Sequence, residues 1–120
     1  MNTWRHGLTG TRRADSDQRV LISAVDDAIR LLADPLRARI VDILADGPAC
    51  NCHLIADTGA SQSNVSNHLR ALRQAGMIAP EPFGRYTYYR LVPEVLEAAA
   101  QRLTELATRA RMTVGERREC

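Results

Sequence analysis

The sequence predicts a mainly helical (α+β) domain of about five helices and one β-hairpin, in the order ααααββα. Apolar residues recur every three or four positions through most of the chain, which is the period of amphipathic helices. An alternating, tyrosine-rich stretch over 86–91 indicates instead a strand. Aromatic residues make up only 4% of the chain, so the core is expected to be aliphatic. A length of 120 residues suits a single hydrophobic core and therefore one domain.

The first three helices are separated by breaking residues. An apolar stripe predicts a helix over 17–33. Asp34 is a preferred N-cap and Pro35 suits a first helical turn, so a second helix is expected over 35–46, where a Gly-Pro pair ends it. A third, short helix is predicted within 49–57, before the sequence Thr-Gly-Ala.

A fourth helix is expected to begin after Ser61, a good N-cap, and to end at Gly76. Its inward face carries Val65, Leu69 and Leu72. Its other faces are rich in serine and asparagine, which are poor helix formers because their side chains compete for the backbone. We therefore expect that these side chains are needed for hydrogen bonds to something outside the domain.

The C-terminal part predicts a hairpin and a long helix. Gly84 and Arg85 lie near the tip of the hairpin. The last helix, over 93–111, carries a continuous apolar seam made of Leu96, Ala99, Leu103, Leu106 and Ala110. Such a seam favours a homodimer formed through the first and last helices. The folded domain is then 17–111, with flexible ends at 1–16 and 112–120.

Charge is unevenly distributed along the chain, although the net charge is only +2. Residues 61–90 carry four arginines against Glu81, whereas residues 31–60 carry four aspartates against two arginines. This concentration of positive charge is typical of a modest nucleic-acid footprint. No apolar run approaches the ~20 residues of a membrane-spanning helix, and residues 1–16 do not resemble a signal peptide, so we expect a cytoplasmic protein.

A helix pair followed by a basic hairpin is the outline of a winged helix-turn-helix. The sequence resembles the ArsR/SmtB metalloregulators, dimeric winged-helix repressors of metal and metalloid resistance genes. The resemblance covers about 18–110 and is carried by Leu32–Ile40, Ser61–Leu72 and Gly84–Leu91. It implies that double-stranded operator DNA, with an inverted repeat, is read by the fourth helix and the wing. The implied DNA-facing residues are Ser61, Gln62, Ser63, Asn64, Ser66, Asn67, His68, Arg70 and, at the wing tip, Arg85. Amide side chains suit adenine, and hydroxyl and guanidinium groups suit phosphate.

The candidate sensing segment is Cys50-Asn51-Cys52, because two thiols one residue apart can chelate a thiophilic ion. In the family, a Cys-x-Cys pair here marks sensors of arsenic and antimony or of cadmium and lead. We therefore expect arsenite or antimonite first and Cd(II), Pb(II) or Zn(II) second. The third cysteine often found three residues later is Ile55 in this chain, which leaves Cys120, His53, an external thiol or no third ligand. No organic cofactor is expected. The family's zinc site on the last helix is absent, since residues 93–111 hold neither His nor Asp.

Helical geometry suggests how an ion would act. Residues two apart on an α-helix point ~200° apart, so chelation is expected to unwind the first turn of the third helix and to release the operator. Alternatives remain open: a response to thiol oxidation, DNA binding that needs no ligand, and metal-enhanced binding. An enzyme with Cys50 or Cys52 as nucleophile and His53 as base is disfavoured, because no orienting carboxylate is evident. A protein-only interaction module is disfavoured by the polar fourth helix.

Overall fold

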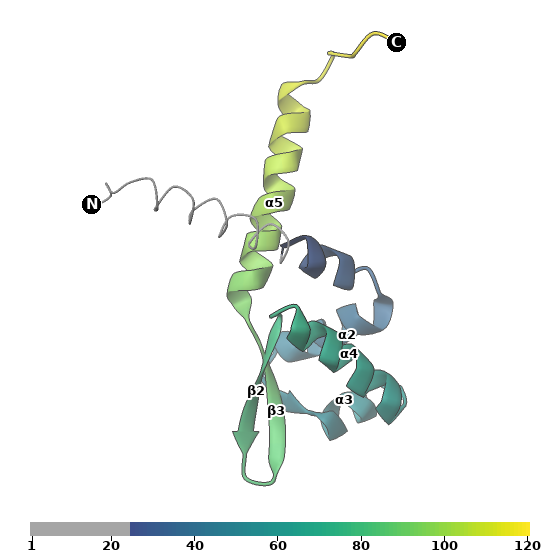
Figure 1. Cartoon of the computed structure of the whole chain (residues 1–120), viewed down its shortest axis with the longest axis vertical. Helices are drawn as coiled ribbons and strands as arrows, with labels where there is room; N and C mark the ends of the chain where they lie inside the picture. Colours follow the sequence, from purple (N-terminus) through teal and green to yellow (C-terminus); the bar gives the residue numbers. More distant parts are fainter. Residues whose placement is uncertain (1–24) are drawn as a thin grey trace, which may run out of the picture.

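The computed structural model describes residues 25–120, which form the helices and the hairpin expected from the sequence. Residues 25–31 are helical, whereas residues 32–33, predicted as the end of this helix, form a turn before Asp34. Residues 17–24 of the predicted first helix and the 1–16 arm lie outside the described residues. The elements that follow are α2 (Pro35–Ala45), β1 (Ala49–Cys50), α3 (Asn51–Thr58), α4 (Gln62–Gln74), β2 (Ile78–Phe83), β3 (Tyr86–Leu91) and α5 (Pro93–Met112). Helices α2, α3 and α4 gather on one side of the hairpin, and α5 extends away from them (Figure 1).

The sheet contains one strand more than the sequence predicts. Its order is β1-β3-β2, with both pairs antiparallel. The prediction of helix from Ala49 was wrong at its first two residues, because Ala49 and Cys50 pair with Tyr89 and Tyr88 of β3. This pairing satisfies backbone groups along an edge of β3 that a lone hairpin would leave open. The predicted hairpin turn is confirmed, with Gly84 at a φ of 62° between β2 and β3.

The caps predicted for two helices are confirmed. The Asp34 carboxylate accepts hydrogen bonds from the backbone N–H groups of Leu36 and Arg37, at 2.9 and 3.1 Å, and Pro35 opens α2. The Ser61 hydroxyl accepts the N–H of Asn64 at 3.2 Å at the start of α4. Both helices therefore begin where the sequence places them.

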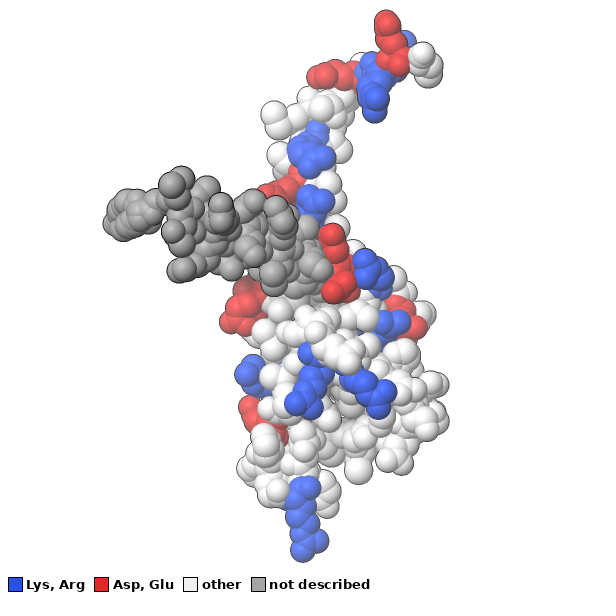
Figure 2. Space-filling model, in the orientation of Figure 1, with Lys and Arg blue, Asp and Glu red and all other residues white. Residues whose placement is uncertain are grey.

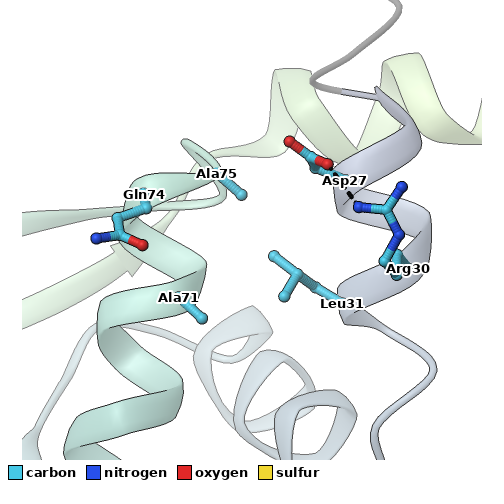
Figure 3. Close-up of a pocket in the computed structure, with 6 residues that line it drawn as sticks. All are labelled: Asp27, Arg30, Leu31, Ala71, Gln74 and Ala75. Carbon is cyan, nitrogen blue, oxygen red and sulfur yellow. Dashed lines mark hydrogen bonds and ion pairs between the residues drawn. The ribbon is translucent and has the colours of Figure 1, made fainter.

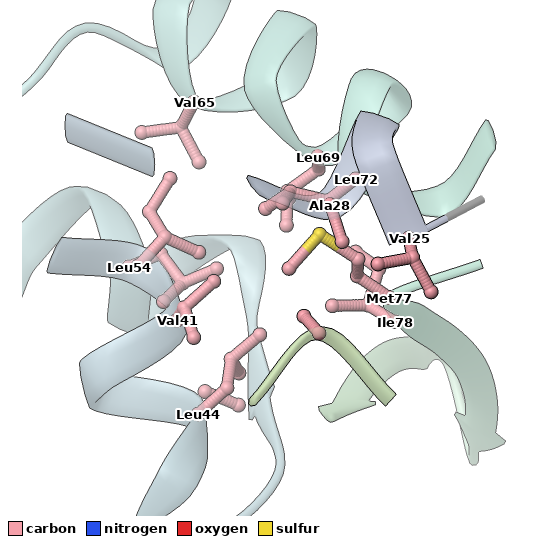
Figure 4. Packing of buried hydrophobic residues seen from close by; sticks show 13 residues of the cluster. Val25, Ala28, Val41, Leu44, Leu54, Val65, Leu69, Leu72, Met77 and Ile78 are labelled. Carbon is pink, nitrogen blue, oxygen red and sulfur yellow. The ribbon is translucent and has the colours of Figure 1, made fainter. Parts of the chain in front are cut away.

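The core lies where α2, α3 and α4 meet the sheet (Figure 4). The largest side chains with no solvent exposure come from α2, α3, α4 and the start of the hairpin: Ile40, Leu54, Leu72, Met77 and Val65. The inward face predicted for α4 is confirmed, since Val65, Leu69 and Leu72 are all buried. This core is almost entirely aliphatic, as the composition predicts, and it fixes the orientation of α4 against α3.

Helix α5 is only weakly attached to that core. Of its predicted seam, only Ala99 is buried, whereas Leu103 and Leu106 are 52% and 39% exposed. In Figure 1, α5 projects beyond the other described elements. Within residues 25–120 no helix combines the length and apolar character needed to cross a lipid bilayer.

Candidate DNA interface and thiol site

Helix α4 presents three different faces. Its inward face is buried, and the opposite face carries the exposed side chains of Ser63, Asn67 and Arg70. The Arg70 guanidinium donates to Asn67 Oδ1 at 3.3 Å, so the two side chains lie together on that face. Among the residues predicted to face DNA, those exposed to solvent are Ser61, Gln62, Ser63, Asn64, Asn67, Arg70 and Arg85. Exposure leaves these residues free to contact DNA, and their role stays a prediction.

Ser66 and His68 are half-buried and lie on the two flanks of α4. Ser66 Oγ accepts a hydrogen bond from Asn51 Nδ2 at 3.4 Å, which links α4 to the start of α3. On the other flank, His68 is close enough to α2 to act electrostatically on Asp34. Hydrogen bonds from Arg37 N–H and Leu36 N–H hold the pKa of Asp34 below its usual value, and the basic side chains of His68 and Arg37 act in the same direction.

The hairpin carries an exposed tip and a paired base. Arg85 lies in the turn with its side chain exposed, beside the exposed aromatic rings of Phe83 and Tyr86. Arg90 instead forms an ion pair with Glu81 at 3.6 Å, between the two strands of the hairpin. In the space-filling view, basic side chains lie over the region of α4 and, separately, at the tip of the hairpin (Figure 2). Both elements that are expected to contact DNA therefore carry positive charge.

The two cysteines of the candidate sensing segment have different surroundings. Cys50 is buried at the end of β1 and is the N-cap of α3, whereas Cys52 lies within α3 and is exposed. The expectation that both lie in one regular helix was wrong, because Cys50 has an extended backbone that pairs with β3. The segment therefore changes from strand to helix between the two thiols.

His53 is held next to Cys50. Its Nδ1 lies 3.2 Å from Cys50 Sγ and also accepts the backbone N–H of Cys50 at 3.2 Å. The imidazole also contacts the ring of Tyr88 on β3, with centroids 5.8 Å apart. The structure thus brings one thiol and one imidazole together directly beside the wing strand, with the second thiol two residues away on α3.

The donor set suits a thiophilic ion, but it is not assembled in this structure. Two thiols and an imidazole are soft or borderline ligands, which favour such ions over oxygen-seeking cations. Among residues 25–120 there is no group of three or more His, Cys, Asp or Glu side chains placed to hold a metal. Ile55, at the position of the family's third cysteine, packs against the core, and Cys120 is exposed at the chain end.

Two surface hollows adjoin α4. One, between the first helix and the end of α4, is shown in Figure 3 and is lined by Asp27, Arg30, Leu31, Ala71, Gln74 and Ala75. Its arginine already pairs with Asp27 at 2.8 Å. The other, of about 260 Å³, lies where α3, α4 and β3 meet and is lined by Asn51, Ser66, Leu69, Arg70, Arg73 and Tyr89.

The second hollow contains residues that the sequence does not single out. Asn51, Arg73 and Tyr89 are remote from one another along the chain, and folding brings them to one place. The one sequence signal is the position of Asn51 between the two cysteines of the candidate sensing segment.

Comparison with known proteins gives matches over the region that holds these sites. Residues 34–79 match the family model described as bacterial regulatory protein, arsR family. The chain is 42% identical over 67 residues to the arsenic resistance transcriptional regulator ArsR1 of Pseudomonas putida, covering 55% of this chain and 52% of the relative. It is 38% identical to the HTH-type transcriptional regulator Rv2034 of Mycobacterium tuberculosis, covering 71% of this chain and 79% of that protein.

A solved structure supports the same relationship. The crystal structure of a possible transcriptional regulator for arsenical resistance is 36% identical, covers 67% of this chain and 83% of its own, and superposes with a TM-score of 0.62. The chain spans between about half and two thirds of the length of the first curated relatives that it matches. The matched part contains α2, β1, α3 and α4, which together carry Cys50, Cys52 and the polar face described above.

Proposed function

The chain belongs to the ArsR family of bacterial regulatory proteins, and on that premise we propose that it is a homodimeric repressor that leaves its operator when a thiophilic ion binds. The relatives it matches are transcriptional regulators, which argues against the cysteine enzyme considered from the sequence. Arsenite and antimonite are the first candidates for the ion, followed by Cd(II), Pb(II) and Zn(II).

In this proposal, α4 enters the major groove and the hairpin reaches the neighbouring backbone. The exposed polar face of α4 supports this, since Gln62, Asn64 and Asn67 can present paired donors and acceptors to base edges. The basic side chains over α4 and at the hairpin tip supply the sequence-independent attraction to phosphate (Figure 2). A dimer would place two such surfaces on an inverted-repeat operator.

The exposed face of α5 supports the dimer. Leu103 and Leu106 belong to an apolar seam that α5 does not bury against the other described elements. Two copies of this seam, related by a two-fold axis, would remove these side chains from water. The first helix was also expected to take part, and its residues 17–24 lie outside the described residues.

The observation that carries the sensing role is the position of the thiols between the wing and α4. Cys50 pairs through its backbone with Tyr88 of the wing strand, and the neighbouring Asn51 donates to Ser66 on α4. A soft ion held by Cys50 and Cys52, with His53 or Cys120 as a further ligand, would draw this segment out of its strand-to-helix path. The hairpin would then lose its backbone pairing with Cys50, and α4 would lose its hydrogen bond from Asn51. A coupling of ~1–3 kcal/mol corresponds to a 5–150-fold change in DNA affinity.

The test measures DNA affinity while ions are added to reduced protein. Fluorescence anisotropy would follow a labelled duplex selected from a random-sequence pool by the wild-type protein. Arsenite, Cd(II), Pb(II) and Zn(II) would be titrated separately. Ni(II), a chemically harder ion, would serve as the control. We expect arsenite to lower affinity by about 5–150-fold. Cys52→Ser should abolish this response without changing DNA affinity, because its exposed side chain makes no described contact with the core.

Truncation before Cys120 tests the third ligand. If arsenite needs Cys120, the truncated chain keeps its DNA affinity and loses its response. If His53 is the ligand, His53→Ala loses the response and truncation has no effect. An unchanged response in the double variant Cys50→Ser with Cys52→Ser would refute a sensing role for this segment. Release by oxidant alone, reversed by a reducing agent, would favour the thiol-oxidation alternative.

A further inference from the structure

The hollow between α3, α4 and β3 has the chemistry of an anion site. Two arginines, Arg70 and Arg73, line it together with the polar side chains of Asn51, Ser66 and Tyr89, and no acidic residue does. Within residues 25–120, neither of these guanidinium groups pairs with a carboxylate, whereas Arg37, Arg39 and Arg90 do. Arginine free of acidic partners suits phosphate, which it can hold through two parallel hydrogen bonds.

Asn51 adds an unusual buried group to this site. Its Oδ1 is buried and has no hydrogen-bond partner among the described residues, while its Nδ2 donates to Ser66 Oγ. Rotating the amide by half a turn would let the Ser66 hydroxyl donate to Oδ1 and would free the NH2 group to donate to a ligand. Such an exchange pairs the buried oxygen and places a third donor group, the Asn51 NH2, beside the two guanidinium groups.

The location of the hollow selects the ligand. It lies on the flank of α4 that faces the wing strand, since its lining comes from α4 and from Tyr89 of β3. When α4 is in the major groove and the hairpin reaches the neighbouring backbone, that sugar-phosphate backbone passes along the flank of α4 that faces β3. The anion available there is a phosphodiester of that strand.

We propose that this hollow is a seat for one backbone phosphate of the bound duplex, and that Asn51 makes the seat depend on the two cysteines beside it. The inference rests on the proposed function, since it needs DNA on α4. Cys50 is buried on β1 and Cys52 is exposed on α3, so their sulfurs lie in different surroundings on either side of Asn51. Bringing both sulfurs to one ion reorients the residue between them. Asn51 then leaves Ser66, and the seat loses a donor and its shape.

The salt dependence of DNA binding tests the seat. The logarithm of the affinity falls with the logarithm of salt concentration by about 0.9 for each phosphate contact. Arg73→Ala should make this slope shallower by about 0.9 for each seat, or about 1.8 for a dimer with two seats. Arg73 is exposed, so its truncation leaves the core intact. The matched control is Arg39→Ala, an exposed arginine on α2 that does not line the hollow, and it should keep the wild-type slope.

Asn51→Ala tests the link to the thiols. Without any ion, the DNA affinity of Asn51→Ala should depend less steeply on salt concentration than that of the wild type. This dependence should resemble that of the wild type saturated with arsenite. Arsenite should change the Asn51→Ala slope no further. Thermal unfolding of each variant, followed by circular dichroism, would show that the fold is retained.

The outcomes separate the inference from the proposed function. If the wild type binds DNA and Arg73→Ala has the same salt dependence of affinity as the wild type, the phosphate seat is refuted and the proposed function is unaffected. Arsenite release at an unchanged wild-type slope overturns the role of Asn51 alone. A wild-type protein with no salt-dependent DNA binding overturns the proposed function itself. If no ion acts on the wild type, ion sensing and the link through Asn51 fall together, and Arg73→Ala still decides the seat.

Discussion

Ser61 begins the helix expected to read DNA, and its replacement separates folding from recognition. Its hydroxyl accepts the Asn64 N–H at 3.2 Å, and the first turn of α4 holds no acidic residue that would stabilise it in another way. Ser61→Ala should lower the free energy of unfolding by about 1 kcal/mol, within a range of about 0.5–2. For a domain of this size, that is a fall in melting temperature of about 4–8 °C.

Ser61→Asp should instead keep its stability and lose affinity for DNA. Aspartate is also a good N-cap, and its charge at a helix N-terminus adds about 0.3–1 kcal/mol, so stability should equal or exceed that of the wild type. The same charge would face phosphate if the start of α4 lies against DNA. Repulsion across about 6 Å, at effective dielectric constants of about 20–80, costs about 0.7–3 kcal/mol, or roughly a 3- to 100-fold loss of affinity.

Two measurements compare the stability and the DNA affinity of the Ser61 variants. Circular dichroism during urea and thermal unfolding, at one fixed protein concentration, gives stability, and anisotropy with a labelled duplex gives affinity. The reasoning predicts that Ser61→Ala loses stability and keeps most of its affinity well below its melting temperature, whereas Ser61→Asp does the reverse. Wild-type affinity in Ser61→Asp would mean that the start of α4 does not face DNA. Wild-type stability in Ser61→Ala would mean that the cap contributes nothing.

Three further predictions concern the core, the pH dependence and the dimer. Leu54→Ala leaves a cavity at a fully buried site and should lower the free energy of unfolding, measured in urea, by about 2–5 kcal/mol. Met112→Ala, at a side chain that is 76% exposed, should lower it by less than about 0.5 kcal/mol. Equal losses in the two variants would contradict the core described here. Because hydrogen bonds from Arg37 and Leu36 lower the pKa of Asp34, its contribution to stability is present above the usual carboxyl pKa of about 3.9 and is lost as pH falls through the lower folded value. The stability of the wild type should therefore approach that of Asp34→Ala in acid, and a gap that widens there would refute this sign. Leu103→Asp with Leu106→Asp should halve the mass measured by sedimentation and weaken DNA binding; an unchanged mass would exclude this face of α5 from the dimer.

Much of the fold follows from local sequence because its signals are local. Asp34 with Pro35, and Ser61, cap the helices that they were expected to cap, since capping depends on a few adjacent residues. The 3.6-residue period identifies the buried face of α4 for the same reason. The strand at Ala49 is different: two residues carry no periodicity, and only the open edge of β3 makes them extended.

The sequence by itself therefore determined the order of the helices and the hairpin, the caps at Asp34 and Ser61, the aliphatic core and the resemblance to a family of regulators. It also marked Cys50 and Cys52 as a pair, because their spacing is a property of the chain. Only the tertiary structure decided that one thiol is buried beside His53 and the wing while the other faces solvent. It alone brought Asn51 and Arg73 to one hollow. The physical reason is that burial and convergence depend on how helices and strands pack across long sequence separations, which local spacing does not specify.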